Sequence, residues 1–274
     1  MDSITQDVWL ARHPYLQRVA DFHSKVSATA ASTPVGRPHT PNFDNHVADY
    51  KAGIPLLWSS QVVIDFEPAE ALLVSLVESL ALQPLPEKFA GECRVLHTQL
   101  LRELNGPRRV VAWLLHNEAF EPAQPGLLRY LGWTALARFL RPLGNAFGAW
   151  REEEQWLRSY CPTCGTPPAM AQLVGIDPGR LRLLSCGCCS TRWRYRRIGC
   201  PFCESADDHR LSALAIEGEK YLRIDYCQSC RAYLKTYDGE GSEPLFLADW
   251  TSLHLDIIAR DRGLKRLAAS LYEL

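Results

Sequence analysis

The chain has 274 residues, enough for one large domain or two modest ones. Hydrophobic residues make up 47% of it and eight residues are tryptophan, a composition that excludes an intrinsically disordered chain. The formal net charge is −1, so overall charge gives no reason to expect binding to nucleic acid or to a membrane surface.

The beginning of the chain, MDSITQDVWLARHPYLQRVADF, lacks the basic and apolar regions of a secretory signal. No run of about 18 apolar residues predicts a membrane-spanning helix. We therefore expect a cytoplasmic protein. In that reducing compartment, clustered cysteines bind metal more often than they form disulfides.

Residues 1–157 are predicted to be helical. FEPAEALLVSLVESLAL and KFAGECRVLHTQLLREL place apolar residues three or four positions apart, as on one helix face. Cys93 falls on such a face, where a small buried apolar side chain is expected. STPVGRPHTPN should be an extended connector. Further helices are expected at 107–119 and 127–157, with Pro142 kinking or dividing the second.

The pattern changes at Cys161 to short strand-like runs. AMAQLVGI and RLRLLSC are joined by Asp177-Pro178-Gly179, and LSALAIE and KYLRIDYC turn near Gly218. After each hairpin comes a third run, TRWRYRRI or RAYLKTYD. The order C-x-x-C, hairpin, C-x-x-C, strand thus occurs twice, which predicts two similar β modules.

The last segment, from about residue 241, is predicted to return to helix. Asp249 or Thr251 can cap it. Leu253, Ile257 and Ile258 give it a face to bury against the N-terminal helices. His254 is expected to be a surface or packing residue.

Four C-x-x-C pairs hold eight of the ten cysteines. Two residues between cysteines let one tight turn direct both sulfurs at a single ion, and two turns complete a tetrahedral shell of four sulfurs. The gaps of 21 residues after Cys164 and 23 after Cys203 are close to zinc-ribbon spacing. We therefore predict one ion bound by Cys161, Cys164, Cys186 and Cys189, and another bound by Cys200, Cys203, Cys227 and Cys230.

Other uses of these cysteines fit less well. A thioredoxin-type redox pair needs a helix start, and a disulfide framework needs an oxidising compartment. Iron and zinc accept the same four sulfurs, so structural sites and one-electron sites both stay open. Cys188 could exchange with a neighbouring ligand, but we expect it to point away as a bystander.

The run TRWRYRR is the most basic stretch. Alternation on a strand would place Arg192, Arg194 and Arg196 on one face. An exposed arginine face could contact phosphate, but residues 156–210 carry eight arginines against four acids, and the thiolate sites would absorb much of that excess. We therefore favour a partner surface over nucleic-acid binding for these arginines.

No sequence pattern for catalysis is evident. The chain lacks a dinucleotide-binding glycine motif, a P-loop, H-E-x-x-H and G-x-S-x-G. A site with four sulfur ligands keeps no open position for a catalytic water. We expect a protein that is not an enzyme.

The sequence resembles the formate dehydrogenase accessory protein FdhE family. The resemblance rests on GIPLL at 53–57, CPTCGTPP, LRLLSCGCCSTRWRYRRIGCPFC, DYCQSCRAYLKTYD and ADWTSLHLDIIARDRG. It implies an α+β protein with a helical domain at 1–157, rubredoxin-like modules at 158–199 and 200–240, and a C-terminal helix at 241–274 that packs back on the helical domain.

The resemblance also implies a function. Members assist maturation of respiratory formate dehydrogenase by binding its catalytic subunit, which makes that subunit the expected partner. Iron is the metal favoured by the resemblance, with zinc as the alternative, and redox sensing is a further expectation. A one-electron carrier, a zinc-ribbon nucleic-acid-binding protein and a homodimer are alternatives that the sequence leaves open.

Overall fold

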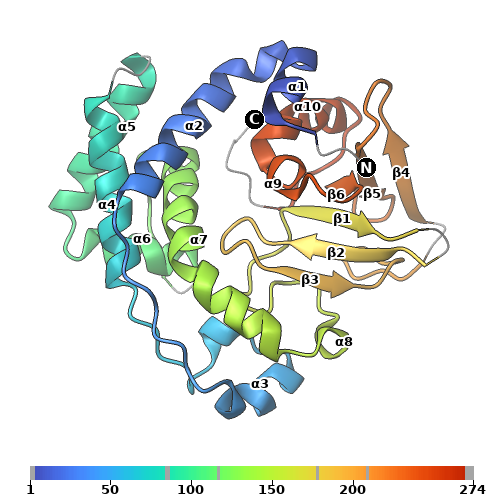
Figure 1. Ribbon diagram of the computed structural model, residues 1–274, viewed down its shortest axis with the longest axis horizontal. Helices are drawn as coiled ribbons and strands as arrows, with labels where there is room; N and C mark the ends of the chain where they lie inside the picture. Colours follow the sequence, from blue (N-terminus) through green and yellow to red (C-terminus); the bar gives the residue numbers. More distant parts are fainter. Residues whose placement is uncertain (1–3, 84–86, 116–117, 177–178, 208–209, 269–274) are drawn as a thin grey trace.

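The computed structural model describes residues 4–83, 87–115, 118–176, 179–207 and 210–268. A group of helices lies beside one β-sheet, and the C-terminal helices lie next to the first helix of the chain (Figure 1). The helical part comes first, the cysteine-bearing β units follow, and helix returns at the end. This order confirms the predicted α+β class.

The helical part is built around α4, which contacts α2, α5, α6 and α7. Its buried side chains are mostly leucines spaced three or four apart, and Cys93 lies fully buried among them as predicted. None of the helices in the described ranges is long and apolar enough to cross a membrane. The helices are α1 (Gln6–Arg12), α2 (Gln17–Ser32), α3 (Val47–Ala52), α4 (Glu67–Leu82), α5 (Glu87–Arg102), α6 (Gly106–Leu114), α7 (Pro125–Trp150) and α8 (Glu153–Trp156), with 3₁₀ turns η1 (Pro14–Leu16), η2 (Phe43–His46) and η3 (Leu56–Trp58).

Helix α7 runs through Pro142 without a break, so of the two expectations there, a kink or a division, the division is wrong. A proline inside a helix costs about 3 kcal/mol because it removes one backbone hydrogen bond and crowds the preceding turn. Here Phe139 and Leu140 before it, and Leu143 and Phe147 after it, are all buried in the core. Burial of four such side chains, each contributing about 1.5–3 kcal/mol, outweighs the cost of the proline.

The six strands form one sheet in the order β3-β2-β1-β6-β5-β4. Each cysteine-bearing hairpin and the strand that follows it make up three neighbouring strands of the sheet. We call β1, β2 and β3 ribbon 1, and β4, β5 and β6 ribbon 2. The ribbons join through parallel pairing of β1 with β6, in which Met170 lies opposite Lys235. The repeat predicted two units but not this continuous sheet. The strands are β1 (Met170–Val174), β2 (Leu181–Ser185), β3 (Arg192–Tyr195), β4 (Leu211–Ala215), β5 (Leu222–Cys227) and β6 (Tyr233–Asp238).

Of the two predicted hairpin turns, the one near Gly218 is confirmed, with φ of +83° at that glycine. Such a conformation is easy only for glycine. The turn at Asp177-Pro178-Gly179 lies partly outside the described residues.

The two ribbons pack mainly into different hydrophobic cores, although Leu234 of ribbon 2 lies in the core of ribbon 1. Ribbon 1 shares its core with the helical part through Leu184 and Trp193. Ribbon 2 shares a second core with α1 and the C-terminal segment, which meet at Trp9, Ile224 and Phe246. The same repeat is therefore packed against two different neighbours.

The C-terminal segment forms α9 (Glu243–Phe246), η5 (Asp249–Ser252) and α10 (Leu253–Asp261) rather than one long helix. The expected cap is wrong, because Ser252 precedes α10 and the Asp249 carboxylate is paired with Lys235 instead. Leu253 and Ile258 pack as expected, whereas Ile257 is 44% exposed. The predicted domain boundaries stay predictions.

Candidate metal centres

Cluster 1 consists of Cys161, Cys164, Cys186 and Cys189, whose sulfurs all lie within 4.8 Å of one another. The Sγ atoms of Cys161 and Cys189 are 3.5 Å apart, and those of Cys164 and Cys186 are 3.4 Å apart. One C-x-x-C pair precedes β1 and the other follows β2. Antiparallel pairing of these strands brings the two ends of the hairpin together.

Cluster 2 consists of Cys200, Cys203, Cys227 and Cys230 and has the same construction around β4 and β5. Its Sγ separations are 3.7 Å between Cys200 and Cys230 and 3.8 Å between Cys203 and Cys227. The eight cysteines are thus grouped in the sequential pairing that their spacing favours.

Both clusters suit a tetrahedral metal ion. Metal–sulfur bonds of about 2.3 Å arranged tetrahedrally place the sulfurs about 3.8 Å apart, close to the separations seen here. Backbone N–H groups also point at the sulfurs, as where Phe202 donates to Cys200 Sγ at 3.4 Å. Burial raises the pKa of Cys227, but N–H groups of Cys230 and Ser229, together with the neighbouring thiols, outweigh that effect and lower it to about 7, whereas at Cys200 burial prevails and raises the pKa to about 12. Such donors favour the thiolate form that a metal requires. The two clusters could therefore hold two ions.

Cluster 1 is enclosed by the helical part of the protein. Backbone N–H groups of Leu56 and Leu57, in the GIPLL stretch, donate to the carbonyls of Pro162 and Thr163 at 2.8 and 2.9 Å. The Trp58 ring leaves no room for a side chain at Gly165, where an added Cβ would come within 2.4 Å of it. The first C-x-x-C turn is therefore held in place from outside the ribbon.

The second turn of cluster 1 is enclosed in the same way. A Cβ at Gly187 would lie 2.7 Å from the Trp133 ring of α7. The Thr191 hydroxyl lies 3.2 Å from Cys189 Sγ, and the Thr166 hydroxyl lies 3.4 Å from Cys164 Sγ. All four cysteines of cluster 1 are buried.

Cys188 does not point away as expected. Its side chain is fully buried beside Cys164 and Thr166. It is absent from the set of four sulfurs, so it lies beside cluster 1 rather than within it.

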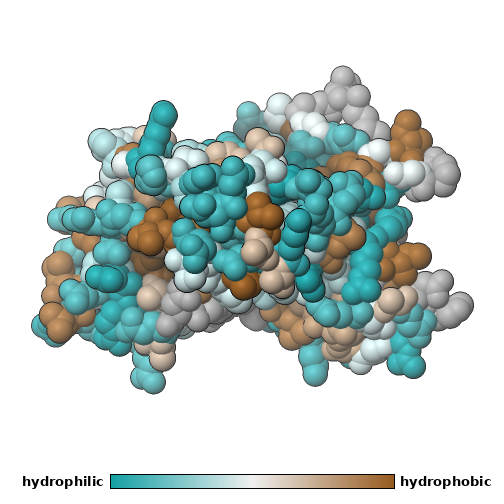
Figure 2. Space-filling model, turned by 90° about the horizontal axis from the view of Figure 1, so that it is seen from below, coloured by the Kyte–Doolittle hydropathy of each residue, from teal (hydrophilic) through white to brown (hydrophobic). Residues whose placement is uncertain are grey.

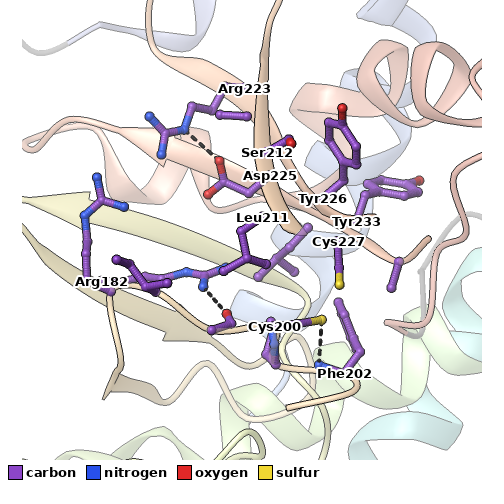
Figure 3. A pocket seen from close by; sticks show the side chains of 17 residues that line it. Arg182, Cys200, Phe202, Leu211, Ser212, Arg223, Asp225, Tyr226, Cys227 and Tyr233 are labelled. Carbon is purple, nitrogen blue, oxygen red and sulfur yellow. Dashed lines mark hydrogen bonds and ion pairs between the residues drawn. The ribbon is translucent and has the colours of Figure 1, made fainter. Parts of the chain in front are cut away.

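Cluster 2 is more open to solvent, because Cys203 is exposed and Cys230 is half-buried. Beside it lies a pocket of about 230 Å³ between the two ribbons. In Figure 3 the sulfurs of Cys200 and Cys227 lie at one end, near Phe202, while Arg223 meets Asp225 at the other. The buried Arg182 side chain donates to the carbonyl oxygen of Gly199 at 2.8 Å.

Two of the three arginines of the predicted face bind side chains on other elements of the same protein. Alternation along β3 is as expected, with Trp193 buried between arginines. Arg192 donates to the side-chain oxygen of Gln172, and Arg194 pairs with Glu154 at 2.5 Å. Arg196 is exposed, with its guanidinium 5.5 Å from the centre of the Tyr195 ring.

A buried ion network under ribbon 2 was not predicted. Lys235 on β6, only 1% exposed, contacts Asp249 and Asp256 at 2.7 Å each. Arg266 reaches the same two carboxylates at 2.5 Å, and the Tyr233 hydroxyl donates to Asp256 at 2.7 Å. The tyrosine and lysine of RAYLKTYD thus meet the acids of ADWTSLHLDIIARD and join ribbon 2 to the C-terminal segment.

Comparison with known proteins points to one family. No family model matches the chain. The FdhE homolog of Aquifex aeolicus is 24% identical over 91% of this chain and 83% of its own length. FdhE homologs of Pseudomonas aeruginosa and Pseudomonas putida are 33% and 32% identical over 61% and 69% of this chain. The matches span 57% and 63% of those two proteins, less than two thirds of their lengths.

The fold is shared with a solved structure. The crystal structure of the FdhE protein from Pseudomonas aeruginosa matches with a TM-score of 0.60 at 21% identity, over 98% of this chain and 97% of that one. In sequence the chain is similar to FdhE proteins, and it shares the fold of one of them.

Proposed function

We propose that this protein assists the maturation of a respiratory formate dehydrogenase by binding its catalytic subunit. The observation that supports this most is the presence of two complete tetracysteine clusters in one sheet of a chain similar to FdhE proteins. Each cluster would hold one ion, iron by the family resemblance or zinc. The role is then recognition rather than turnover, because a shell of four sulfurs offers no position for a substrate.

The side of the molecule at cluster 2 is the part best suited to meet the client. There Ile198 is exposed beside the pocket, and Cys203 brings a ligand sulfur to the surface. Figure 2 shows the face of the molecule on the side where α3 and α8 lie. This face is mostly hydrophilic, and its apolar residues form small separate patches. Apolar surface next to polar groups is a common feature of binding sites. Arg196 after β3 would contribute charge.

The test is co-purification of the tagged full chain with the formate dehydrogenase catalytic subunit, without oxygen and in air. We expect capture of the subunit, reduced in Ile198→Glu and in Cys203→Ser. Cys93→Ala is the matched control, because this cysteine lies on α5 and belongs to neither cluster. Absence of capture in both atmospheres would contradict the proposal.

The arginine surface is tested separately. Arg194→Glu combined with Arg196→Glu should weaken capture if the strand β3 face meets the client. Equal capture by this variant and the wild type would mean that β3 is not part of the binding surface. The cluster 2 side would then be the remaining candidate.

One-electron transfer is the second candidate, favoured by the exposed sulfur of Cys203. Iron held by four thiolates absorbs visible light and can accept and return one electron, whereas zinc cannot. Reversible bleaching of an iron-loaded sample by a one-electron reductant would support it. A colourless, zinc-loaded protein that still captures the client would exclude it.

A further inference from the structure

Away from both clusters, two histidines and a glutamate converge from three distant parts of the chain. His13 lies between α1 and η1, Glu219 lies in the β4–β5 turn, and His254 lies on α10. One oxygen of Glu219, Oε1, is 2.7 Å from the Nε2 atoms of both histidines. The side chains are only 10%, 6% and 14% exposed, in chain order.

The arrangement leaves His13 facing two acceptors. Its Nδ1 lies 3.0 Å from the carbonyl oxygen of Trp9, which can only accept a hydrogen bond, so we assign the ring proton to Nδ1. The other nitrogen, Nε2, then directs its lone pair at the Glu219 carboxylate. Two electron-rich atoms this close need a cation to join them, either a second proton on the ring or a metal ion.

A histidine that binds metal is usually oriented in this way. Metal-ligating histidines donate their second ring N–H to a carbonyl or carboxylate, which fixes the tautomer. Stacking of Trp9 on His13, with ring centroids 3.9 Å apart, also holds the imidazole in place.

Glu219 has unused capacity to bind. Its second oxygen, Oε2, is buried and has no hydrogen-bond partner among the described residues. Within those residues its ion-pair partners are His13 and His254. A buried carboxylate that has no lysine or arginine within ion-pair distance among the described residues needs positive charge from another source.

The spacing of the rings also suits one shared ion. Two imidazoles bound to a tetrahedral zinc at about 2.0–2.1 Å have ring centroids about 5 Å apart. The centroids of His13 and His254 are 5.1 Å apart. Binding would require the Glu219 carboxylate to withdraw slightly, because nitrogen and oxygen ligands of one zinc ion lie about 3.3 Å apart.

We propose that His13, Glu219 and His254 form a third metal site, specific for a divalent transition-metal ion such as Zn²⁺. Two imidazoles and one carboxylate are a donor set that zinc readily accepts, with a fourth position left for water. The ion ties α1 to the tip of ribbon 2 and to α10. This site is independent of the two sulfur clusters and of the role proposed above.

The test is the combined iron and zinc content of the full chain after saturation with Zn²⁺ and removal of excess, measured by mass spectrometry. Wild type should hold three ions, and His254→Gln and Glu219→Gln should hold two. The control His97→Gln, on α5, should keep three. Two ions in wild type, or three in both site variants, would overturn the proposal.

Cobalt gives a second measurement that does not depend on the folding of variants. Co²⁺ added to protein with zinc in both sulfur clusters should give weak visible bands without the intense near-ultraviolet thiolate absorption. Intense thiolate absorption, or no uptake of cobalt, would place no ion at the histidines and contradict the proposal.

Discussion

Clusters 1 and 2 are built by the same repeat, yet they meet different surroundings. Every cysteine of cluster 1 is buried, whereas cluster 2 exposes Cys203 and half-exposes Cys230. The four Sγ separations given above, each between the two C-x-x-C turns of one cluster, differ by no more than 0.4 Å, from 3.4 Å to 3.8 Å. The difference therefore lies outside the four ligands, in what covers them.

The two ribbons are supported by different segments of the chain. Helical residues, among them Trp58 and Trp133, lie on the turns of cluster 1. Ribbon 2 instead takes its support from the C-terminal segment and the ion network around Lys235, on the strands rather than on the cysteine turns. We conclude that cluster 1 joins the helical part to the sheet, and that ribbon 2 has a second source of stability.

The largest expected effect is a difference in stability between cysteine variants of the two clusters. Cys161→Ser should lose one ion and destabilise the protein by on the order of 5 kcal/mol or more, because a structural metal contributes its binding energy to folding. Cys203→Ser should also weaken binding of one ion but cost about 1–3 kcal/mol, because water can reach this ligand position. Metal analysis and thermal unfolding measure both. Equal destabilisation by the two variants would contradict the distinction.

Removing the ammonium of Lys235 tests the second source of stability. Lys235→Met leaves Asp249 and Asp256 with one cation fewer, and breaking a buried pair in this way costs about 3–5 kcal/mol. Chemical denaturation measures the loss. Lys265→Met is the control, a lysine outside the network. A similar loss in both variants would show that the network does not stabilise ribbon 2.

Two glycines with positive φ provide a matched pair of variants that tests how tightly Trp58 packs on cluster 1. Gly165 and Gly218 have φ of +78° and +83°, so alanine at either costs about 1–2 kcal/mol of backbone strain. Only at Gly165 would the new methyl group collide with Trp58, which adds about 1–3 kcal/mol. Thermal unfolding of the two alanine variants should differ by that amount. Equal losses would mean that Trp58 gives way freely.

The ion network also predicts a pH effect. Burial raises the pKa of Asp249, but Lys235 and Arg266 outweigh burial and hold it well below its usual 3.8. The stabilisation, on the order of 2 kcal/mol, is complete above pH 3.8 and is lost as the pH falls toward the lowered pKa. The stability difference between wild type and Asp249→Asn should therefore narrow as the pH falls below 3.8. A constant difference would contradict this assignment.

The features that could be predicted from the sequence are those that depend on the local spacing of residues. The C-x-x-C pairs and the hairpins between them indicated both clusters, because two residues between cysteines and two paired strands determine the geometry of each one. The pairing of β1 with β6 could not be predicted, since β6 begins about 60 residues after β1 ends.

The histidine–glutamate group and the partners of the β3 arginines depend on contacts between segments that are distant in the sequence. His13 and His254 meet at Glu219 although they lie near opposite ends of the chain, and no spacing rule relates them. Likewise, the alternation along β3 could be predicted, but the partners of Arg192 and Arg194 could not, because Gln172 and Glu154 belong to other elements.

The most direct test of the difference between the clusters is the rate at which a thiol-modifying reagent releases metal from the folded protein. Release should occur in two phases of one ion each, the fast phase from cluster 2 through Cys203 and the slow phase from cluster 1. Cys203→Ser should abolish or alter only the fast phase. Release of both ions in a single phase, or a fast phase unchanged in Cys203→Ser, would contradict the account.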